Sequence, residues 1–468
     1  MEVGNRLRSL IASYLEQTNC SLQEFSRRCG LNKGTLSAIL RYQIPKPLSL
    51  KELDRITEAM GHPEGELYPM YLEECVVDNK WKLSRLKPYL LQCARMGRLD
   101  CIQLALPAVL DELGHIPVIF AVGEQLYQEG YHRESAPFFE AVAESEQYQH
   151  AERLARSHYR LFMLQLSDDY EMNLRAAIRF DPFRNRLPEE EQPDAMLQLI
   201  NVYFTLNRLD RVHELADELS NYTYTMYTYE CKNKQYNEEE RTTKYPLVVY
   251  YGYAYLMKAA ACDKQKKYHE AKQYTQYYTD LSWFKGLGEA GKVEVRKFSI
   301  WAKANGFAYE LMTGNTSVLP SYIAYIEHNE DEVLPALEKI MEAANRYGLD
   351  VSGILDQFED RISTYIDSQE ASSSYYNMHF TLERFANFCY ELSHYYYQQQ
   401  NFDLAVKYVL QSLSSSIKMG DKAGFIKCVT LFEEFRRNTR VENQRSYENM
   451  IRGVRKNAEN EMLFVTYA

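Results

Sequence analysis

Six polar or basic side chains near the start of the chain have the chemistry that nucleic-acid recognition requires. They are Gln23, Asn32, Lys33, Thr35, Ser37 and Arg41. Lysine and arginine neutralise phosphates and donate hydrogen bonds, while amide and hydroxyl groups both donate to and accept from base edges. These residues form one interface only if the elements that carry them turn them to the same side.

The sequence predicts two helices in this region, one that ends before Gln23 and one that contains it. Apolar residues recur at helical spacing over residues 5–17, which predicts an amphipathic helix there. Ser21 and Glu24 match the capping-box pattern, in which the serine accepts from an amide and the glutamate reaches back. We therefore expect a second helix over residues 22–28.

A glycine turn and two further helices follow. Gly30 can supply the left-handed turn, and Asn32 can cap a helix over residues 33–41. A second capping box at residues 49–52 opens a helix that ends at Met60. Two short helices around a glycine turn, inside a set of about five, form a helix-turn-helix. The apolar residues of the two helices are predicted to be core: Leu22, Phe25, Leu31, Leu36, Ile39 and Leu40.

The stretch SLQEFSRRCGLNKGTLSAILRY resembles the lambda-repressor-like helix-turn-helix family. The matching residues are Ser21, Gln23, Gly30, Leu31, Leu36, Ser37 and Ile39. Ser26 stands where that family usually has alanine, and no glycine closely follows Leu40. The resemblance implies that the second helix of the motif enters the major groove of double-stranded DNA, with the first at a phosphate. The bases would then face Asn32, Lys33, Thr35, Ser37 and Arg41, and the phosphate would face Gln23.

The charge distribution favours the same interpretation. The chain has 468 residues and a net charge of −11. Residues 1–51 hold eight Lys or Arg against three Glu, a charge of +5, so the rest carries −16. A basic head on an acidic body is typical of a DNA-reading module joined to a body that does not read DNA. The alternative is that these N-terminal helices form a protein-docking module without affinity for DNA. One module neutralises few phosphates, so we expect a homodimer.

The body of the chain, residues 71–468, is predicted to be a helical repeat array. The tetratricopeptide pattern of paired helices recurs loosely over residues 117–145, 194–220, 252–280 and 386–413. The turns between the paired helices are predicted at Gly130, Asn207, Lys266 and Gln400. Stacked pairs would form a right-handed solenoid with a concave groove. The fold class is therefore all-α, with domain boundaries at 1–70 and 71–468.

The repeat register places one set of side chains in that groove. The candidates for ligand binding are Asn201, Phe204, Tyr253, Asn387, Tyr390 and Tyr397, with Leu197, Leu256, Asp263 and His394 on the same face. Asparagine amides can clamp a peptide backbone, and tyrosines form flat walls with a polar tip. The alternative is that most of these aromatic residues pack the helices together. Residues 232–244 and the runs 189–191 and 238–240 are predicted to be solvated loops.

A lambda-repressor-like head on a tetratricopeptide-like body is similar to the RRNPP family of peptide-pheromone receptors. The resemblance implies a homodimeric quorum-sensing transcription regulator that binds a short signalling peptide in its groove. It also implies that Asn201 and Asn387 clamp the peptide backbone. The alternative is an interaction protein that captures or inhibits another protein and uses the head for docking, and a weaker one is a small-molecule sensor.

Other classes of function find little support. The sequence has no Gly-rich phosphate loop, HExxH or GxSxG motif, so we expect no enzyme activity and no cofactor. Nine scattered cysteines without a CxxC pair indicate buried thiols in a reducing compartment rather than a metal site. The apolar stretches are too short to span a membrane, and no secretion signal is recognisable, so we expect a cytoplasmic protein.

Overall fold

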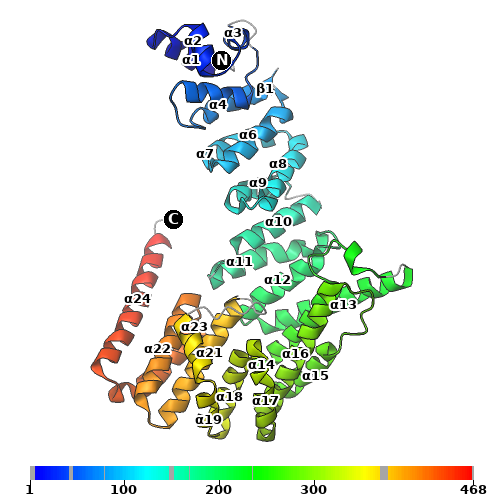
Figure 1. Cartoon of the computed structure of the whole chain (residues 1–468), viewed down its shortest axis with the longest axis vertical. Coiled ribbons are helices and arrows are strands. Elements are labelled where there is room, and N and C mark those ends of the chain that lie inside the picture. The colour runs from blue at the N-terminus through cyan, green and yellow to red at the C-terminus, as the bar shows by residue number, and fades with distance from the viewer. Residues whose placement is uncertain are drawn as a thin grey trace. The chain divides into compact units, whose positions relative to one another are not determined.

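A computed structural model of the chain describes residues 6–41, 46–77, 80–146, 152–167, 169–233, 236–368 and 378–465 (Figure 1). Within these ranges it has 24 α-helices, seven short 3-10 helices and one antiparallel hairpin of two-residue strands, β1 (Val76–Val77) and β2 (Lys80–Trp81). The all-α class is confirmed. The small hairpin was not predicted, because two-residue strands leave no periodic signal. None of the helices in the described ranges is long and apolar enough to cross a membrane.

The chain divides into two compact units. The first contains residues 1–165 and 182–187, and the second contains residues 166–181 and 188–468. Whether the functional boundary lies at residue 70 stays a prediction.

The first unit begins with four helices whose ends the sequence signals predicted to within two residues. They are α1 (Arg6–Gln17), α2 (Leu22–Arg28), α3 (Lys33–Ile39) and α4 (Leu50–Ala59). The third ends at Ile39 instead of residue 41, so Arg41 follows it rather than belonging to it. Both halves of the Ser49–Glu52 capping box are present at the start of α4. At α2 only half of the predicted box forms. Ser21 accepts from the Glu24 amide, but the Glu24 carboxylate pairs with Arg28 one turn along instead of reaching back.

Helix pairs continue the first unit in chain order (Figure 1). They are α5 (Tyr68–Tyr71), α6 (Leu83–Arg95), α7 (Leu99–Leu110), α8 (Ile116–Gln128), α9 (His132–Ser145) and α10 (Glu152–Gln165). One hydrophobic core runs from Leu7 in α1 to Val142 in α9 without a break at residue 70. The head helices therefore share their apolar interior with the first helix pairs behind them.

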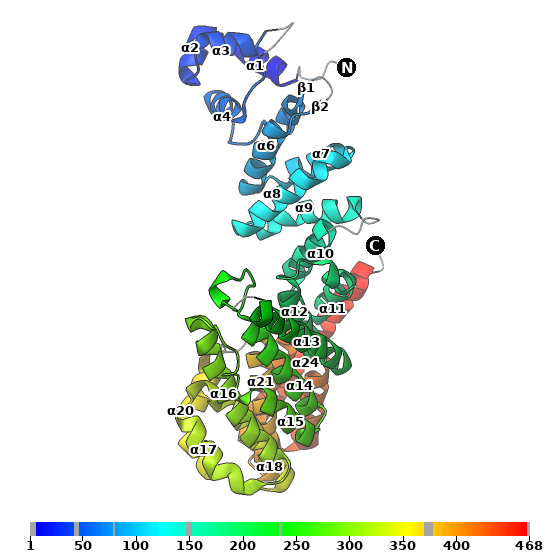
Figure 2. The ribbon, with the colours of Figure 1, turned by 90° about the vertical axis from the view of Figure 1, so that its right-hand side faces the viewer.

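The second unit is a longer series of packed helices (Figure 2). Its helices are α11 (Tyr170–Phe180), α12 (Gln192–Thr205), α13 (Leu209–Asn233), α14 (Leu247–Lys264), α15 (Tyr268–Thr279), α16 (Glu289–Met312), α17 (Leu319–Glu327), α18 (Val333–Tyr347), α19 (Ser352–Gln357), α20 (Glu359–Ser368), α21 (Met378–Gln398), α22 (Phe402–Met419), α23 (Lys422–Phe435) and α24 (Val441–Val465). Consecutive helices from α11 to α18 pack against one another, as do α21, α22 and α23, while α24 packs against α22. In addition, α12, α14, α16, α18 and α21 pack against one another in that order.

The four predicted turns between paired helices are confirmed by the backbone. Gly130, Asn207, Lys266 and Gln400 have φ angles of 87°, 55°, 60° and 60°. These left-handed residues end one helix and let the chain reverse into the next. Only glycine adopts this conformation without strain, and asparagine tolerates it better than lysine or glutamine. Each position lies between the apolar residues of one predicted helix and those of the next, so it could be predicted from the sequence.

The predicted loop at residues 232–244 is shorter and more fixed than expected. Helix α13 continues to Asn233, and the Glu238 carboxylate accepts hydrogen bonds from the Gly288 and Gly291 amides, both at 3.1 Å. A carboxylate at the N-terminus of α16 satisfies unpaired amides and opposes the helix dipole. The prediction that Glu238 is merely solvated was therefore wrong. A charge run in sequence does not reveal which helix end it will meet.

All nine cysteines are free thiols, and eight are buried, as predicted. Cys231 in α13 is the exposed one. Burial raises the pKa of Cys29 to about 11 and of Cys75 to about 12, so these thiols stay protonated at neutral pH.

Candidate functional site

The first candidate site is the outer face of α3. Leu36 and Ile39 are fully buried on its inner side, while Asn32, Lys33, Ser37 and Arg41 are exposed and Thr35 is half-buried. Gln23, near the start of α2, is also exposed. The structure thus leaves all six predicted residues reachable within the first unit.

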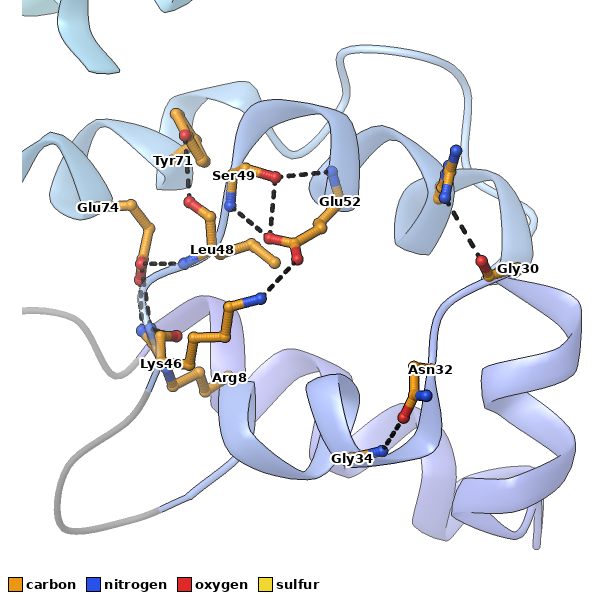
Figure 3. Close-up of polar contacts among 11 residues, drawn as sticks. Arg8, Gly30, Asn32, Gly34, Lys46, Leu48, Ser49, Glu52, Tyr71 and Glu74 are labelled. Carbon is orange, nitrogen blue, oxygen red and sulfur yellow. Dashed lines mark hydrogen bonds and ion pairs between the residues drawn. The ribbon is translucent and has the colours of Figure 1, made fainter. Parts of the chain in front are cut away.

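Local hydrogen bonds fix where α3 begins (Figure 3). Gly30 has a φ of 61°, so the chain turns sharply after α2. The Asn32 side-chain oxygen accepts from the Gly34 amide at 2.7 Å and caps α3. Arg55 of α4 donates to the Gly30 carbonyl at 3.4 Å. Asn32 therefore has a structural role through its oxygen, and its amide nitrogen is the group left to donate to a ligand.

A buried ion pair holds the other end of α3. The Arg8 guanidinium pairs with the Glu74 carboxylate through both of its terminal nitrogens, one of them at 3.0 Å. Arg8 also donates to the carbonyl of Ile39, the last residue of α3, at 2.9 Å. Glu74 in turn accepts from the Leu48 amide at 3.2 Å (Figure 3). This pair joins α1, α3, the segment before α4 and the residues after α5.

Replacing Asn32 with alanine is expected to loosen the first turn of α3. The lost cap costs about 1 kcal/mol of local stability, because an amide is left unpaired. Amide hydrogen exchange in α3, read by mass spectrometry, should become faster by roughly fivefold for 1 kcal/mol. Asn32→Asp retains a capping oxygen and serves as the control. Equal exchange rates in the alanine and aspartate variants would contradict the capping role.

The second candidate site is a cavity of about 340 Å³ inside the second unit. One face of each of the contacting helices α12, α14 and α16 lines it, at helical spacing. The residues are Leu197, Gln198, Asn201 and Phe204 from α12, Val249, Tyr253, Leu256, Met257, Ala260 and Asp263 from α14, and Trp301, Asn305, Ala308 and Tyr309 from α16. Tyr245, Tyr322, Glu332, Pro335, Lys339 and Arg384 complete the lining. Its volume is within the range of small-ligand sites, about 300–1,000 Å³.

Three of the six predicted ligand residues line this cavity together. Asn201, Phe204 and Tyr253 are among its walls, and the Tyr253 hydroxyl donates to the Asn201 side-chain oxygen. Leu197, Leu256 and Asp263, placed on the same face by the repeat register, also line it. The register inferred for α12 and α14 therefore matches the helix faces that surround the cavity.

The other three predicted residues, all in α21, lie elsewhere. Asn387 donates to Glu338 of α18 at 3.2 Å, while Tyr390 and Tyr397 pack against the apolar cluster of α22, α23 and α24. The residue of α21 that lines the cavity is Arg384. A ligand role for Asn387, Tyr390 and Tyr397 stays a prediction, because no contact in the structure tests it.

Sequence reasoning missed the wall formed by α16. Trp301, Asn305 and Ala308 follow one another at intervals of four and three residues and share one helix face. The Asn305 amide donates to the Tyr278 hydroxyl at 3.0 Å. The helical spacing was visible, but residues 292–328 fit the repeat pattern poorly, so no register could be assigned there.

One end of the cavity is rich in buried and half-buried charged groups. The Lys339 ammonium lies 2.8 Å from Asp263 and 3.0 Å from Glu342, and Arg384 lies 3.5 Å from Glu338. Burial raises the pKa of Glu338 to about 7, even though Arg384 and Lys339 oppose the shift. The carboxylates around Lys339 hold the pKa of this lysine above its usual value against burial.

Comparison with known proteins gives no family. No family model matches the chain, and no curated protein matches it. Among the residues that the structure covers, no group of His, Cys, Asp and Glu side chains is placed to hold a metal ion.

Proposed function

We propose that the protein is a sequence-specific DNA-binding transcription regulator whose affinity for DNA is controlled by a short peptide in the cavity of the second unit. The observation that carries the DNA-binding part is the α2–α3 pair. Its turn is left-handed, both N-cap side chains accept a backbone hydrogen bond, Phe25, Leu36 and Ile39 are buried, and five of the six predicted contact residues are exposed. This combination is what a helix-turn-helix needs to place a helix in the major groove.

The cavity supports the regulatory part. Alternate helices along the chain contribute one face each to it, which is the arrangement expected of the inner helices of a tetratricopeptide-like array. The amides of Asn201 and Asn305, on different helices, can pair with a peptide backbone whatever its side chains. The peptide would act by binding one conformation of the array more tightly and so shifting the population of DNA-competent dimers.

The double variant Lys33→Ala with Arg41→Ala tests DNA binding. Both residues are exposed beside α3, and losing two cations is expected to weaken binding to DNA from the protein's own promoter region by at least tenfold in a gel shift at fixed salt. The variant Lys80→Ala with Arg133→Ala removes the same charge from exposed positions elsewhere in the first unit and should bind like the wild type.

The same gel shift also distinguishes DNA binding from the alternative function, which is protein docking through the N-terminal helices. Unchanged binding in the Lys33 and Arg41 variant, or no binding by the wild type, would leave an interaction protein that docks through its head. An equal loss in both double variants would show that only net charge matters and that α3 does not read DNA.

A further inference from the structure

Five aromatic side chains form a continuous strip on the surface of the second unit, where α14 packs against both α13 and α15 (Figure 2). This aromatic strip consists, in spatial order, of Tyr224 in α13, Trp283 after α15, Tyr251 and Tyr255 in α14, and Tyr277 in α15. Neighbouring ring centroids in this order are 6.0, 5.2, 5.1 and 4.4 Å apart. Tyr224 and Tyr277, at the two ends, are 49 % and 51 % exposed, and the other three rings are half-buried. A connected aromatic surface of this kind is typical of an interaction site.

The aromatic strip and the cavity lie on different faces of α14. None of the five strip residues lines the cavity, whereas Tyr253, two residues from both Tyr251 and Tyr255, does. Two residues along a helix correspond to a rotation of about 200°, so the strip tyrosines point away from the cavity. The ligand site therefore does not account for the strip.

Contacts behind the strip hold Trp283 in place. The buried Tyr227 ring lies 5.7 Å from the Trp283 ring, and the Tyr227 hydroxyl donates to the Trp283 carbonyl at 3.2 Å. The same hydroxyl accepts from the Lys285 amide at 2.7 Å. Before the tryptophan, the Asp280 carboxylate accepts from the Ser282 amide at 2.9 Å. A surface that is already ordered loses little conformational entropy when a partner binds.

The polar groups of the strip are uncharged and offer hydrogen-bond donors. Lys258, whose ammonium lies beside the strip, is paired with Asp217. In the part of the chain that the structure describes, the hydroxyls of Tyr224 and Tyr277 and the indole N–H of Trp283 have no hydrogen-bond partner. Tyrosine hydroxyls can donate, and the indole N–H can only donate. The electrostatic complement of the strip is therefore an uncharged segment that is rich in acceptors and poor in donors.

We propose that the aromatic strip binds a proline-rich segment of a partner protein in the polyproline II conformation. Proline keeps its carbonyl acceptor but has no backbone N–H, so such a segment brings acceptors to the strip and few donors that need pairing. The polyproline II helix has no internal hydrogen bonds, and its carbonyls are open to a binding surface. Its rings pack against aromatic side chains at little cost in entropy. This inference does not depend on a peptide in the cavity.

Two other classes of partner fit the strip less well. Nucleic-acid bases also stack on aromatic rings, but residues 52–468 carry a net charge of −16, which is the total of −11 less the +5 of residues 1–51. This charge repels a phosphate backbone. A sugar ring can also pack on an aromatic face, but its many hydroxyls need acceptors, and the strip has neither carboxylates nor amides. An oligonucleotide and an oligosaccharide therefore serve as competing probes.

Fluorescence anisotropy on the full chain tests this partner. The probe is fluorescein-labelled decaproline, and the control is an uncharged labelled peptide of equal length made of alternating glycine and serine. We expect decaproline to bind at least tenfold more tightly, and neither a ten-nucleotide oligothymidylate nor cellohexaose to displace it. Equal binding of the two peptides would overturn the proposal. Displacement by either competitor at a lower concentration than unlabelled decaproline would overturn it in favour of base or sugar binding.

Three variants place the binding on the strip. Tyr224→Ala and Tyr277→Ala should each weaken decaproline binding about tenfold, because each removes a half-exposed ring and a donor. Tyr229→Ala is the matched control, since Tyr229 lies in α13 like Tyr224 and is 67 % exposed but does not belong to the strip. It should bind like the wild type. Unchanged affinity in both strip variants, with thermal melts showing that they are folded, or an equal loss in the control would also overturn the proposal.

Discussion

Replacing Glu74 with alanine is expected to lower the free energy of unfolding of the first unit by about 3–5 kcal/mol. The Arg8 and Glu74 side chains are only 10 % and 5 % exposed. Without the carboxylate, the Arg8 guanidinium would be a buried charge without its counterion, and the Leu48 amide would lose its acceptor. Hydrogen exchange resolved by segment should show faster exchange in α1, α3 and α4, with little change in the second unit.

Two further variants separate the ion pair from the loss of a surface charge. Glu73→Ala removes a neighbouring carboxylate whose partner Arg6 is 80 % exposed, and should cost less than about 1 kcal/mol. The double variant Arg8→Met with Glu74→Met replaces the pair with apolar side chains and should recover part of the loss. A Glu74→Ala protein as stable as Glu73→Ala would show that Arg8 reaches water once its partner is gone.

The consequence for DNA recognition follows from the contact between Arg8 and the end of α3. Because Arg8 donates to the Ile39 carbonyl, its displacement frees the end of the helix that would enter the groove. Glu74→Ala should therefore weaken DNA binding although Glu74 lies outside the proposed DNA-contacting face. The measured loss should be smaller at a temperature where α3 is fully protected from exchange.

Replacing Glu338 with glutamine is expected to stabilise the second unit at alkaline pH. The pKa of Glu338 is raised from 4.5 to about 7 by burial, so between these values the folded protein holds a proton that the unfolded chain releases. The contribution of Glu338 to the free energy of unfolding is therefore fully present below pH 4.5 and is lost as the pH rises through 7. Glutamine carries no charge at any pH, so the variant should gain about 2–3 kcal/mol over the wild type at pH 8 and little at pH 4.5.

Glu342→Gln serves as a control, because its effect on the free energy of unfolding at pH 8 should have the opposite sign. Lys339, 3.0 Å away, keeps the pKa of Glu342 below its usual value although the carboxyl is half-buried, so its charged form stabilises the fold. Removing that charge should destabilise the protein at pH 8 and have less effect in acid. Urea unfolding of both variants from pH 4.5 to 8 checks the pair. Parallel pH profiles for the wild type and Glu338→Gln would contradict the assignment to Glu338.

Local signals in the sequence predicted local structure well. Ser49, Asn32 and Gly30 each act within a few residues, so capping and turn rules were sufficient to place the ends of the first helices. The same rules could not find the partner of Arg8, because Glu74 is 66 residues away and an arginine in an amphipathic helix normally faces solvent.

The repeat pattern predicted part of the cavity lining but not all of it. Asn201 and Tyr253 were placed correctly on helix faces because the repeats around them have a recognisable register. On α21 the register led to Asn387, Tyr390 and Tyr397, while Arg384 lines the cavity. Arg384 and Asn387 are three residues apart and lie on the same side of α21, so the cavity meets this helix about one turn nearer its start than the register predicted. The buried charges of α18 gave no signal, since charged residues in a helix are normally assigned to its solvated side.

The uninterrupted apolar interior of the first unit limits how such a protein can be rearranged by recombination. Tyr68 and Tyr71 both contact the ring of Tyr89, with centroids 6.1 and 5.6 Å apart, and the Tyr89 hydroxyl donates to the Tyr68 carbonyl. A crossover at residue 70 would separate the Tyr68 ring from those of Tyr71 and Tyr89 and would join apolar surfaces from two different parents. A chimera with N-terminal helices from another protein would therefore also need α6 and α7 from that same protein.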